Sequence, residues 1–381
     1  MTGSPGSRVL LSGPDLGEAE IRAAVAALEA GEVGSFGAQP PRFEAALAAR
    51  TGFAHVAAVA SGTAAMHLAL KLAGVRAGDA VIAPTFTFIG GVAPIAQLGA
   101  VPIFVDCEAD SFGLAPEAVE AAFALARREG LTVRAVAPAD LFGRCTDLTG
   151  ILAIARAHGA TVVADSAEAL GATRDGRHAG LQADLAVYSF NANKIITAVG
   201  GGAIASGDPA LIERARRLAN QGRTPGGVEY EHEEPGFNYR LPALLAAIGA
   251  AQMDGLDARI ARRRRIHDLY RARLGVLDGV RFDDEAPGER ATRWLTVMQL
   301  SPGGGRPGPR ALIDVLAARG IEARPVWKPM HRQRAFAGGL HVGGETADRL
   351  HATSLCLPSG SRLTDADIDR VCEAVTAALT A

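Results

Sequence analysis

The sequence predicts an α/β fold in which a mixed, mostly parallel β-sheet forms a large domain and a smaller α+β domain follows at the C-terminal end. Between about residues 55 and 206, short runs rich in β-branched residues alternate with stretches rich in alanine and leucine. The short runs are apolar throughout, which is typical of strands that helices cover on both faces. The pattern therefore indicates a parallel sheet between layers of helices.

The apolar runs "AVIAP", "VPIFVD", "VRAVAPAD", "ATVVAD" and "LAVYSF" are the expected strands, in that order along the chain. Stretches such as "TAAMHLALKLAG" and "LTGILAIARAHGA" are the expected helices between them. Ligands gather at the carboxyl ends of strands in such sheets. Three polar residues fall there, because Asp165 ends one run, Ser189 lies near the end of another, and Lys194 follows a few residues later.

A long helical region is expected from about residue 241 to 274, and a smaller α+β portion follows it. We place the large domain at residues 1–250 and the small C-terminal domain at residues 251–381. The arginine run 262–265 is expected to be a solvated helix face rather than a nucleic-acid site, because the formal charge of the chain is −2.

Composition excludes several other classes of protein. The 381 residues are 48% hydrophobic and 21% charged, without the basic excess typical of partners of nucleic acids or membrane surfaces. No apolar run reaches the roughly 18 residues of a membrane span, and the N-terminus lacks a signal-peptide pattern. The four cysteines are scattered, so we expect free thiols and a cytoplasmic protein. No P-loop or HExxH motif occurs, and we expect no metal site.

Lys194 is the only charged residue between Tyr188 and Ser206, in a stretch that otherwise reads as strand, glycine turn and strand. A buried ammonium group costs several kcal/mol unless it is paired, neutralised or covalently used. Asp165 is suited to a protonated heterocycle nitrogen, because a buried carboxylate needs a cationic partner. A helix N-cap is an equally good interpretation of Asp165 alone.

A phosphate seat is expected where "SGTAAMHLAL" enters a helix, because Ser61, Gly62 and Thr63 present backbone amides and hydroxyls at its positive end. Serine and threonine are also ordinary N-caps, so this signal is weak alone. A phosphate seat, an aspartate for a ring nitrogen and a lysine that can form a Schiff base together describe a site for pyridoxal 5'-phosphate.

With these residues in place, the sequence resembles the DegT/DnrJ/StrS family of sugar aminotransferases, which share the aspartate-aminotransferase fold. The matching segments lie in family order and include "VASGTAAMHLAL", "DSAEALGA", "YSFNANKIIT", "PGFNYRLPALL" and "RPVWKPMHRQRAF". "SFNANK" and "WKPMH" look most like the branch that aminates C4 of nucleotide-linked 4-keto-6-deoxy sugars, as in the UDP-bacillosamine and desosamine pathways.

The resemblance implies a role for each matching residue. Lys194 would carry the Schiff base and shuttle a proton, and Asp165 would pair with the pyridine nitrogen. Phe88 would stack on the ring. Glu168 would lie near the 3-hydroxyl oxygen, where it must be protonated, turned away or aimed at substrate to avoid repulsion. The phosphate would be held by Gly62, Thr63, Ser189 and, from the neighbouring subunit, Asn238.

A homodimer with shared active sites follows from that role of Asn238. The resemblance also implies that the substrate is contacted by Asn191, Arg240, Trp327, Lys328 and His331. Trp327 could instead be a core residue of the small domain, and His331 a satisfied polar residue.

The expected activity is transfer of an amino group from L-glutamate to C4 of a nucleotide-linked 4-keto-6-deoxy hexose, with UDP-4-keto-6-deoxy-N-acetylglucosamine as the expected acceptor. Pyridoxamine 5'-phosphate would be the intermediate form of the cofactor. The same chemistry on a TDP-linked keto-sugar, a C3 ketone or an aminocyclitol precursor stays open. A family dehydratase would have histidine in place of Lys194, and a non-catalytic cofactor-binding regulator would not turn over with glutamate.

Overall fold

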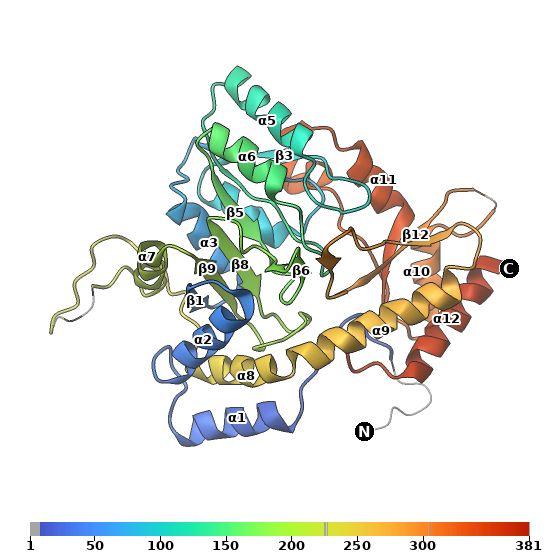
Figure 1. Cartoon of the computed structure of the whole chain (residues 1–381), viewed down its shortest axis with the longest axis horizontal. Helices are drawn as coiled ribbons and strands as arrows, with labels where there is room; N and C mark the ends of the chain where they lie inside the picture. The colour runs from blue at the N-terminus through green and yellow to red at the C-terminus, as the bar shows by residue number, and fades with distance from the viewer. Residues whose placement is uncertain (1–7, 225, 227, 304, 381) are drawn as a thin grey trace.

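The computed structural model describes residues 8–224, 226, 228–303 and 305–380, and its centre is an eight-stranded β-sheet (Figure 1). In spatial order its strands are β1 (His55–Val59), β9 (Gly202–Ser206), β8 (Leu185–Ser189), β5 (Thr161–Asp165), β4 (Val133–Val136), β2 (Ala80–Pro84), β3 (Val101–Val105) and β14 (Leu340–Val342). Strands β8 to β14 of this order run parallel, whereas β9 is antiparallel to both of its neighbours. The predicted mixed, mostly parallel α/β fold is confirmed.

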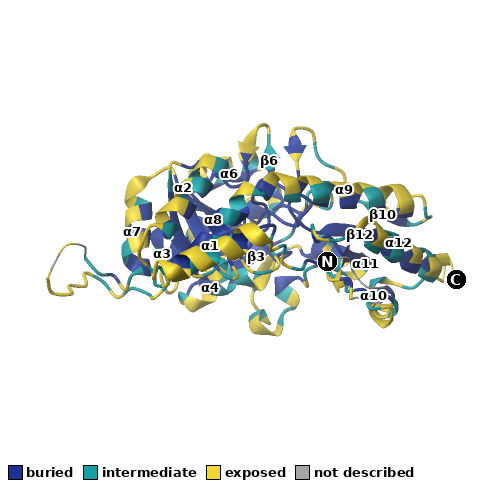
Figure 2. Cartoon of the chain, turned by 90° about the horizontal axis from the view of Figure 1, so that it is seen from below, coloured by how far each residue is buried: buried dark blue, intermediate teal, exposed yellow. Residues whose placement is uncertain are grey.

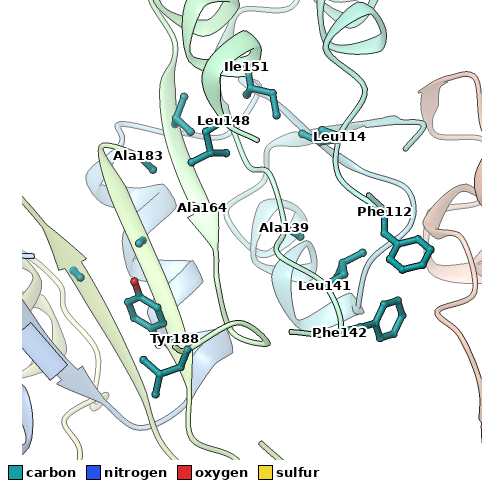
Figure 3. Close-up of a cluster of buried hydrophobic side chains, with 14 of the residues drawn as sticks. Phe112, Leu114, Ala139, Leu141, Phe142, Leu148, Ile151, Ala164, Ala183 and Tyr188 are labelled. Atoms are coloured by element: carbon teal, nitrogen blue, oxygen red, sulfur yellow. The ribbon is translucent and has the colours of Figure 1, made fainter. Parts of the chain in front are cut away.

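Helices cover both faces of this sheet. Because successive residues of a strand point to opposite sides, each strand contributes side chains to both hydrophobic clusters. In β2, Ile82 packs into a cluster with α2 (Gln39–Thr51), α5 (Pro116–Arg128), α6 (Thr149–Ala157) and α8 (Ala243–Asp254), while Val81 packs into a second cluster with α3 (Gly62–Leu72), α4 (Ala93–Gln97) and α7 (Pro209–Ala219). Figure 2 shows the buried interior between helices with exposed outer faces. Figure 3 shows part of the first cluster, including Phe112, Ile151 and Tyr188.

The C-terminal portion has its own sheet and core. Helix α9 (Leu256–Leu274) leads from the large sheet to this portion (Figure 1), whose four strands are β10 (Val280–Phe282), β12 (Thr296–Leu300), β15 (Ser354–Leu357) and β13 (Arg324–Pro325). A third hydrophobic cluster joins this sheet to α9, α10 (Pro309–Ala318) and α12 (Asp365–Thr380). The remaining elements are α1 (Glu18–Glu29), η1 (Ile89–Gly91), β6 (Thr173–Arg174), β7 (Arg177–His178), β11 (Glu289–Arg290), η2 (Met330–Arg332), η3 (Arg334–Phe336) and α11 (Glu345–Thr353).

The chain crosses between the two portions more than once. Val9 pairs with Ile321 of the smaller portion, and β14 leaves that portion to pair with β3 at the edge of the large sheet. The predicted domain boundary at residue 250 falls inside α8, and β14 returns to the large sheet after it. The division into two domains at that residue stays a prediction. No helix in the described part of the chain is long and apolar enough to cross a membrane, and all four cysteines are free and buried.

The expectation of a solvated arginine face is wrong for the middle of the run. Arg263 is only 1% exposed, and its guanidinium donates to the carbonyl oxygens of Trp294 and Ser359 and to the hydroxyl of Ser12. Burial lowers the pKa of Arg263 to about 10. Helix α9 directs the Arg263 side chain into the interior, where its guanidinium donates hydrogen bonds to backbone oxygens.

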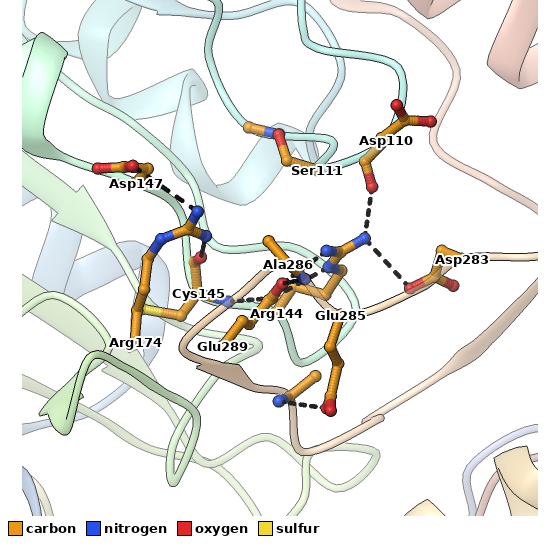
Figure 4. Close-up of polar contacts among 12 residues, drawn as sticks. Asp110, Ser111, Arg144, Cys145, Asp147, Arg174, Asp283, Glu285, Ala286 and Glu289 are labelled. Carbon is orange, nitrogen blue, oxygen red and sulfur yellow. Dashed lines mark hydrogen bonds and ion pairs between the residues drawn. The ribbon is translucent and has the colours of Figure 1, made fainter.

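A buried network of ion pairs connects the two portions of the molecule (Figure 4). Arg144, which follows β4, makes two hydrogen bonds to the Glu289 carboxylate, at 3.0 and 2.6 Å, and an ion pair with Asp283 at 3.3 Å. These three side chains are at most 4% exposed. Burial by itself would raise the pKa of Glu289, but the hydrogen bonds and charge of Arg144 hold it below its ordinary value.

Replacing Arg144 with methionine is expected to lower the free energy of unfolding by about 3–5 kcal/mol, because the buried Glu289 carboxylate loses its cation, whereas Asp283 keeps its ion pair with Arg293. Since the folded-state pKa of Glu289 is depressed, this stabilisation exists above the ordinary pKa of glutamate and is lost as the pH falls through the folded-state value. The difference between variant and wild type should therefore be largest at neutral pH and shrink in acid, as measured by urea unfolding at several pH values.

The control for that measurement is Arg22→Met, which removes an exposed ion pair with Glu18 on α1. It should change stability by less than about 0.5 kcal/mol at every pH. A loss in the Arg144 variant that is no larger than that of the control, or that does not depend on pH, would contradict this account.

Candidate active site

A cavity of about 320 Å³ opens at the carboxyl ends of the parallel strands. Residues that end or follow β2, β4, β5 and β8 meet there, because parallel strands end at one edge of the sheet. Strand β1 runs in the same direction as β8, since β9 is antiparallel to both, so α3 also starts at this edge. The cavity collects nine of the predicted site residues, which are Gly62, Thr63, Phe88, Asp165, Glu168, Ser189, Asn191, Lys194 and Trp327.

The start of α3 forms one end of the cavity. The Ser61 hydroxyl caps the helix by accepting the amide of Ala64 at 3.0 Å. A Cβ atom on Gly62 would lie 2.8 Å from Cβ of Ser189, and one on Gly202 would lie 2.5 Å from the Ser61 carbonyl oxygen. Only glycine therefore lets the three chain segments meet, which leaves helix amides and the Ser189 hydroxyl around one small space suited to a phosphate.

Asp165 lies at the end of β5, inside the cavity. Its Oδ1 accepts the amide of Ala167 at 3.1 Å, and a Cβ atom on Gly91 would lie 2.2 Å from its Oδ2. Burial raises the pKa of Asp165, whereas the bond from Ala167 and the charge of Lys194 lower it. The neighbouring Asp140 is more strongly affected, because burial raises its pKa to about 6. A carboxylate in this position is suited to a cationic N–H group.

Lys194 lies between two partners. Its Nζ is 3.5 Å from Oε1 of Glu168 and 4.0 Å from the ring centroid of Trp294. The lysine side chain is 11% exposed and that of Glu168 is 5% exposed. Glu168 is therefore turned toward the lysine amine and shielded from solvent. Sequence reasoning missed Trp294, because nothing in "ATRWLTVMQL" marks it as different from a core tryptophan.

Aromatic rings form the outer wall of the cavity. The ring of Phe88 is 49% exposed and lies 5.2 Å from the ring of Trp327, which stacks on Phe142 at 6.0 Å. The Trp327 Nε1 atom is buried, and no residue in the described part of the chain accepts its hydrogen bond. A stacking role for Phe88 and a substrate role for Trp327 stay predictions.

A second chamber of about 570 Å³ adjoins this wall and shares Phe88, Asn193, Trp294 and Trp327 with the cavity. Lys328 lies on its lining, in an exposed position. A substrate role for Lys328 stays a prediction.

Three predicted residues lie outside the described lining of both spaces. The ring of His331 is bound by the Thr85 hydroxyl at 2.7 Å and lies 3.4 Å from Asp348, so the structure does not bring it to the cavity. Arg240 lies in a separate groove beside Leu241 and Asn220. Asn238 pairs with Asn220, the residue that directly follows α7. A role for Asn238 or Arg240 would therefore require a second subunit.

The residues present fit pyridoxal phosphate. The glycine-lined space at α3 would receive the phosphate, the partly buried Asp165 carboxylate would face the ring nitrogen, and Lys194 lines the same cavity of about 320 Å³. These are the three groups that this cofactor requires.

Comparison with known proteins gives the same answer. The family model of the DegT/DnrJ/EryC1/StrS aminotransferases matches residues 14–376. The chain is 40% identical over 370 residues, covering 96% of this chain and 94% of the relative, to a Bacillus subtilis (strain 168) protein named "Putative pyridoxal phosphate-dependent aminotransferase EpsN". It is 34% identical over 369 residues, covering 97% of each chain, to GDP-perosamine synthase of Caulobacter vibrioides.

Among solved structures, DesI in the presence of its TDP-sugar product superposes with a TM-score of 0.87 at 28% identity, covering 98% of this chain and 93% of that one. The family match spans nearly the whole chain, and the fold and the composition of the cavity agree with it. The chain therefore belongs to the DegT/DnrJ/EryC1/StrS aminotransferase family, and the expectation of a pyridoxal phosphate-dependent sugar aminotransferase is confirmed.

Proposed function

We propose that this enzyme transfers the amino group of L-glutamate to C4 of a nucleotide-linked 4-keto-6-deoxy hexose, with UDP-4-keto-6-deoxy-N-acetylglucosamine as the preferred acceptor. The observation that supports the site most strongly is that Lys194, Asp165, Gly62 and Ser189 line one cavity although they come from four different segments. In this proposal Lys194 is the residue to which the cofactor is bonded.

When bound, pyridoxal phosphate supplies an electron sink for the carbon that loses or gains a proton. The Asp165 carboxylate would hold the ring nitrogen in its protonated form, and the α3 amides with the Ser189 hydroxyl would hold the phosphate. The Lys194 amine takes the proton from the donor carbon and returns a proton in the second half-reaction. The Lys194 side chain is 11% exposed, which limits access of water to this amine.

The proposed acceptor class is supported by relatives and by the shape of the site. Named relatives include GDP-perosamine synthases, and DesI was solved with a TDP-sugar product. The second chamber could receive the part of a nucleotide sugar beyond the reacting ring, with Lys328 toward its diphosphate. A TDP-linked acceptor remains the second candidate because of the likeness to DesI.

We also propose that the enzyme acts as a cytoplasmic homodimer with shared sites. Ile21, Val25 and Leu28 form an apolar stripe on the outer face of α1, each between 45% and 63% exposed, and Phe36 nearby is 73% exposed. Exposed apolar side chains in one place are typical of a protein interface. A dimer would also give Asn238 and Arg240 the neighbouring site that their predicted roles require.

The acceptor is tested in one half-reaction. The enzyme is loaded with pyridoxamine phosphate and mixed separately with UDP-, TDP- and GDP-linked 4-keto-6-deoxy sugars, and the visible absorbance of the returning aldehyde form of the cofactor is followed. The fastest return is expected with the UDP-linked N-acetyl sugar. If glutamate converts the enzyme but none of the three acceptors restores the absorbance, the C4 keto-sugar proposal is wrong, and C3 ketones and cyclitols are the next acceptors.

A further inference from the structure

The carbonyl group of Asn193, one peptide bond before Lys194, is held by two buried donors. The hydroxyl of Ser12 donates to this oxygen at 2.7 Å, and Nε1 of Trp294 donates to it at 2.8 Å. A carbonyl oxygen has two lone pairs, so both are used. Ser12 lies near the N-terminus and Trp294 precedes β12. The turn that carries Lys194 is therefore connected at one atom to two distant segments.

Arg263 on α9 binds both of these donors. Its guanidinium donates to the hydroxyl of Ser12 at 3.1 Å and to the carbonyl oxygen of Trp294. Because a guanidinium can only donate, the Ser12 hydroxyl accepts from Arg263 and has its single hydrogen left for Asn193. The arginine therefore sets the direction of the hydrogen bond that Ser12 makes beside Lys194.

The burial of Arg263 is not explained by stability alone. The side chain is buried, and its hydrogen bonds within the described part of the chain go to two carbonyl oxygens and one hydroxyl, with no carboxylate among them. A buried charge is costly to desolvate, and a well-packed apolar side chain often stabilises a core at least as well. The third acceptor, the carbonyl oxygen of Ser359, follows β15, and the Ser359 amide binds the carbonyl oxygen of Leu11. The arginine therefore joins the segments that meet beside Asn193.

Trp294 connects this network to the reacting amine. Its ring centroid lies 4.0 Å from Nζ of Lys194, while its Nε1 binds the carbonyl oxygen of Asn193. Arg293, which directly precedes it, has φ 55°, a left-handed conformation that non-glycine residues keep only where the surroundings enforce it. One rigid side chain therefore lies against the tip of the lysine and also fixes the backbone from which the lysine extends.

We propose that Arg263 is a positioning residue for Lys194. It acts through Ser12 and Trp294, which fix the carbonyl group of Asn193 and thereby the backbone that carries the lysine side chain. The inference rests on the proposed function in taking Lys194 as the group that moves the proton. Proton transfer needs the amine within reach of the reacting carbon, and a displacement of about 1 Å costs up to about 10²-fold in rate. The network acts on the place of the amine and not on its charge.

Ser12→Ala is the mildest way to break the network, because it removes one hydroxyl group. In a single-turnover reaction of the enzyme loaded with pyridoxal phosphate, the rate constant at saturating glutamate should fall about tenfold. The glutamate concentration at half-saturation should change by less than about twofold, since Ser12 does not line the cavity of about 320 Å³. Ser12→Thr keeps a hydroxyl and should restore the rate constant to within about threefold of wild type. Arg263→Met should lower it about as much as Ser12→Ala or more, and Ser12→Ala decides the question if the Arg263 variant does not fold.

Amide hydrogen exchange, followed by mass spectrometry with and without the cofactor, measures the position of the backbone directly. Ser12→Ala should raise the exchange rate of a peptide covering residues 190–197 by about threefold to tenfold, because one buried hydrogen bond to this turn is lost. The matched control is Ser206→Ala. The Ser206 hydroxyl is likewise buried, donates to the carbonyl oxygen of Asp184 at 2.8 Å and accepts the amide of Asp208 at 3.1 Å, but it lies at the opposite edge of the sheet. The control should lose a similar amount of stability in urea and keep the wild-type rate constant and exchange.

Borohydride reduction followed by peptide mapping identifies the lysine bonded to the cofactor in the same samples. If this lysine is Lys194 but Ser12→Ala behaves like the control, the network only stabilises the fold, so the inference is wrong and the proposed function stands. A slower reaction without faster exchange of residues 190–197 would also overturn positioning through the backbone. If the cofactor maps to another lysine, the role proposed for Lys194 and the positioning role of Arg263 both fail.

Discussion

Replacing Lys194 with alanine is expected to reduce turnover of glutamate by about 10⁴-fold or more while the cofactor still binds. Positioned acid–base groups alone contribute about 10²–10⁴-fold, and the bond between lysine and cofactor is lost in addition. The phosphate seat at α3 and the Asp165 carboxylate do not depend on the lysine, so affinity for the cofactor should survive. Steady-state turnover and the spectrum of the dialysed protein measure the two effects.

Lys194→Arg separates chemistry from folding in this experiment. An arginine keeps a cation beside Glu168 and Trp294 but cannot bond to the cofactor or give up a proton near neutral pH. It should therefore be as inactive as the alanine variant yet unfold at a urea concentration closer to that of wild type. Lys71→Ala, in the last turn of α3, is the control and should retain activity. A Lys194 variant with one tenth of wild-type turnover would exclude the proposed mechanism.

The sequence could predict the parts of the fold and site that depend on local pattern. The five apolar runs are strands β2, β3, β4, β5 and β8, because continuous β-branched stretches of that length fit strands buried on both faces. Because β5 and β8 are parallel, Asp165 and Ser189 at their carboxyl ends lie at the same edge of the sheet. The cap at Ser61 is likewise local, since it depends on a hydroxyl three residues before the amide that it binds.

The parts that could not be predicted depend on contacts between distant segments. Trp294 reaches Lys194 only because Gly143 lets two backbone segments approach closely, and no pattern around residue 294 encodes that approach. Strand β14 has three residues, too few for a period, and it pairs with β3 from far along the chain. The burial of Arg263 depends on the carbonyl oxygens of Trp294 and Ser359, which belong to other elements.

Glu168 is the predicted site residue whose charge the sequence left open. The resemblance placed its carboxylate near an oxygen of the cofactor, where like charges would repel. In the structure one oxygen of Glu168 lies near Lys194 and the other accepts the amide of Phe142, and a cofactor contact for Glu168 stays a prediction. Burial raises the pKa of Glu168, and the charge of Lys194 and the hydrogen bond from Phe142 offset only part of this effect.

Asp165→Asn is expected to lower turnover by about 10²–10³-fold, because it removes one preorganised charge at the reacting ring without changing the shape of the site. An asparagine oxygen can still accept the Ala167 amide, as Oδ1 of Asp165 does at 3.1 Å, so the end of β5 should keep its structure. The variant loses only the negative charge that favours a protonated ring nitrogen. Turnover, together with the pH dependence of the visible spectrum of bound cofactor, measures this loss.

The control for that substitution is another aspartate next to a strand of the same sheet. Asp184 accepts the amide of Val162 at 2.8 Å but lies outside the cavity lining, so Asp184→Asn should change turnover by less than about twofold. Unfolding in urea should be similar for the two variants, since each keeps its hydrogen bond to the backbone. If Asp165→Asn retained turnover within about threefold of wild type, the ring nitrogen would not depend on this carboxylate, and the position of Asp165 at the end of β5 would be explained by its bond to Ala167 alone.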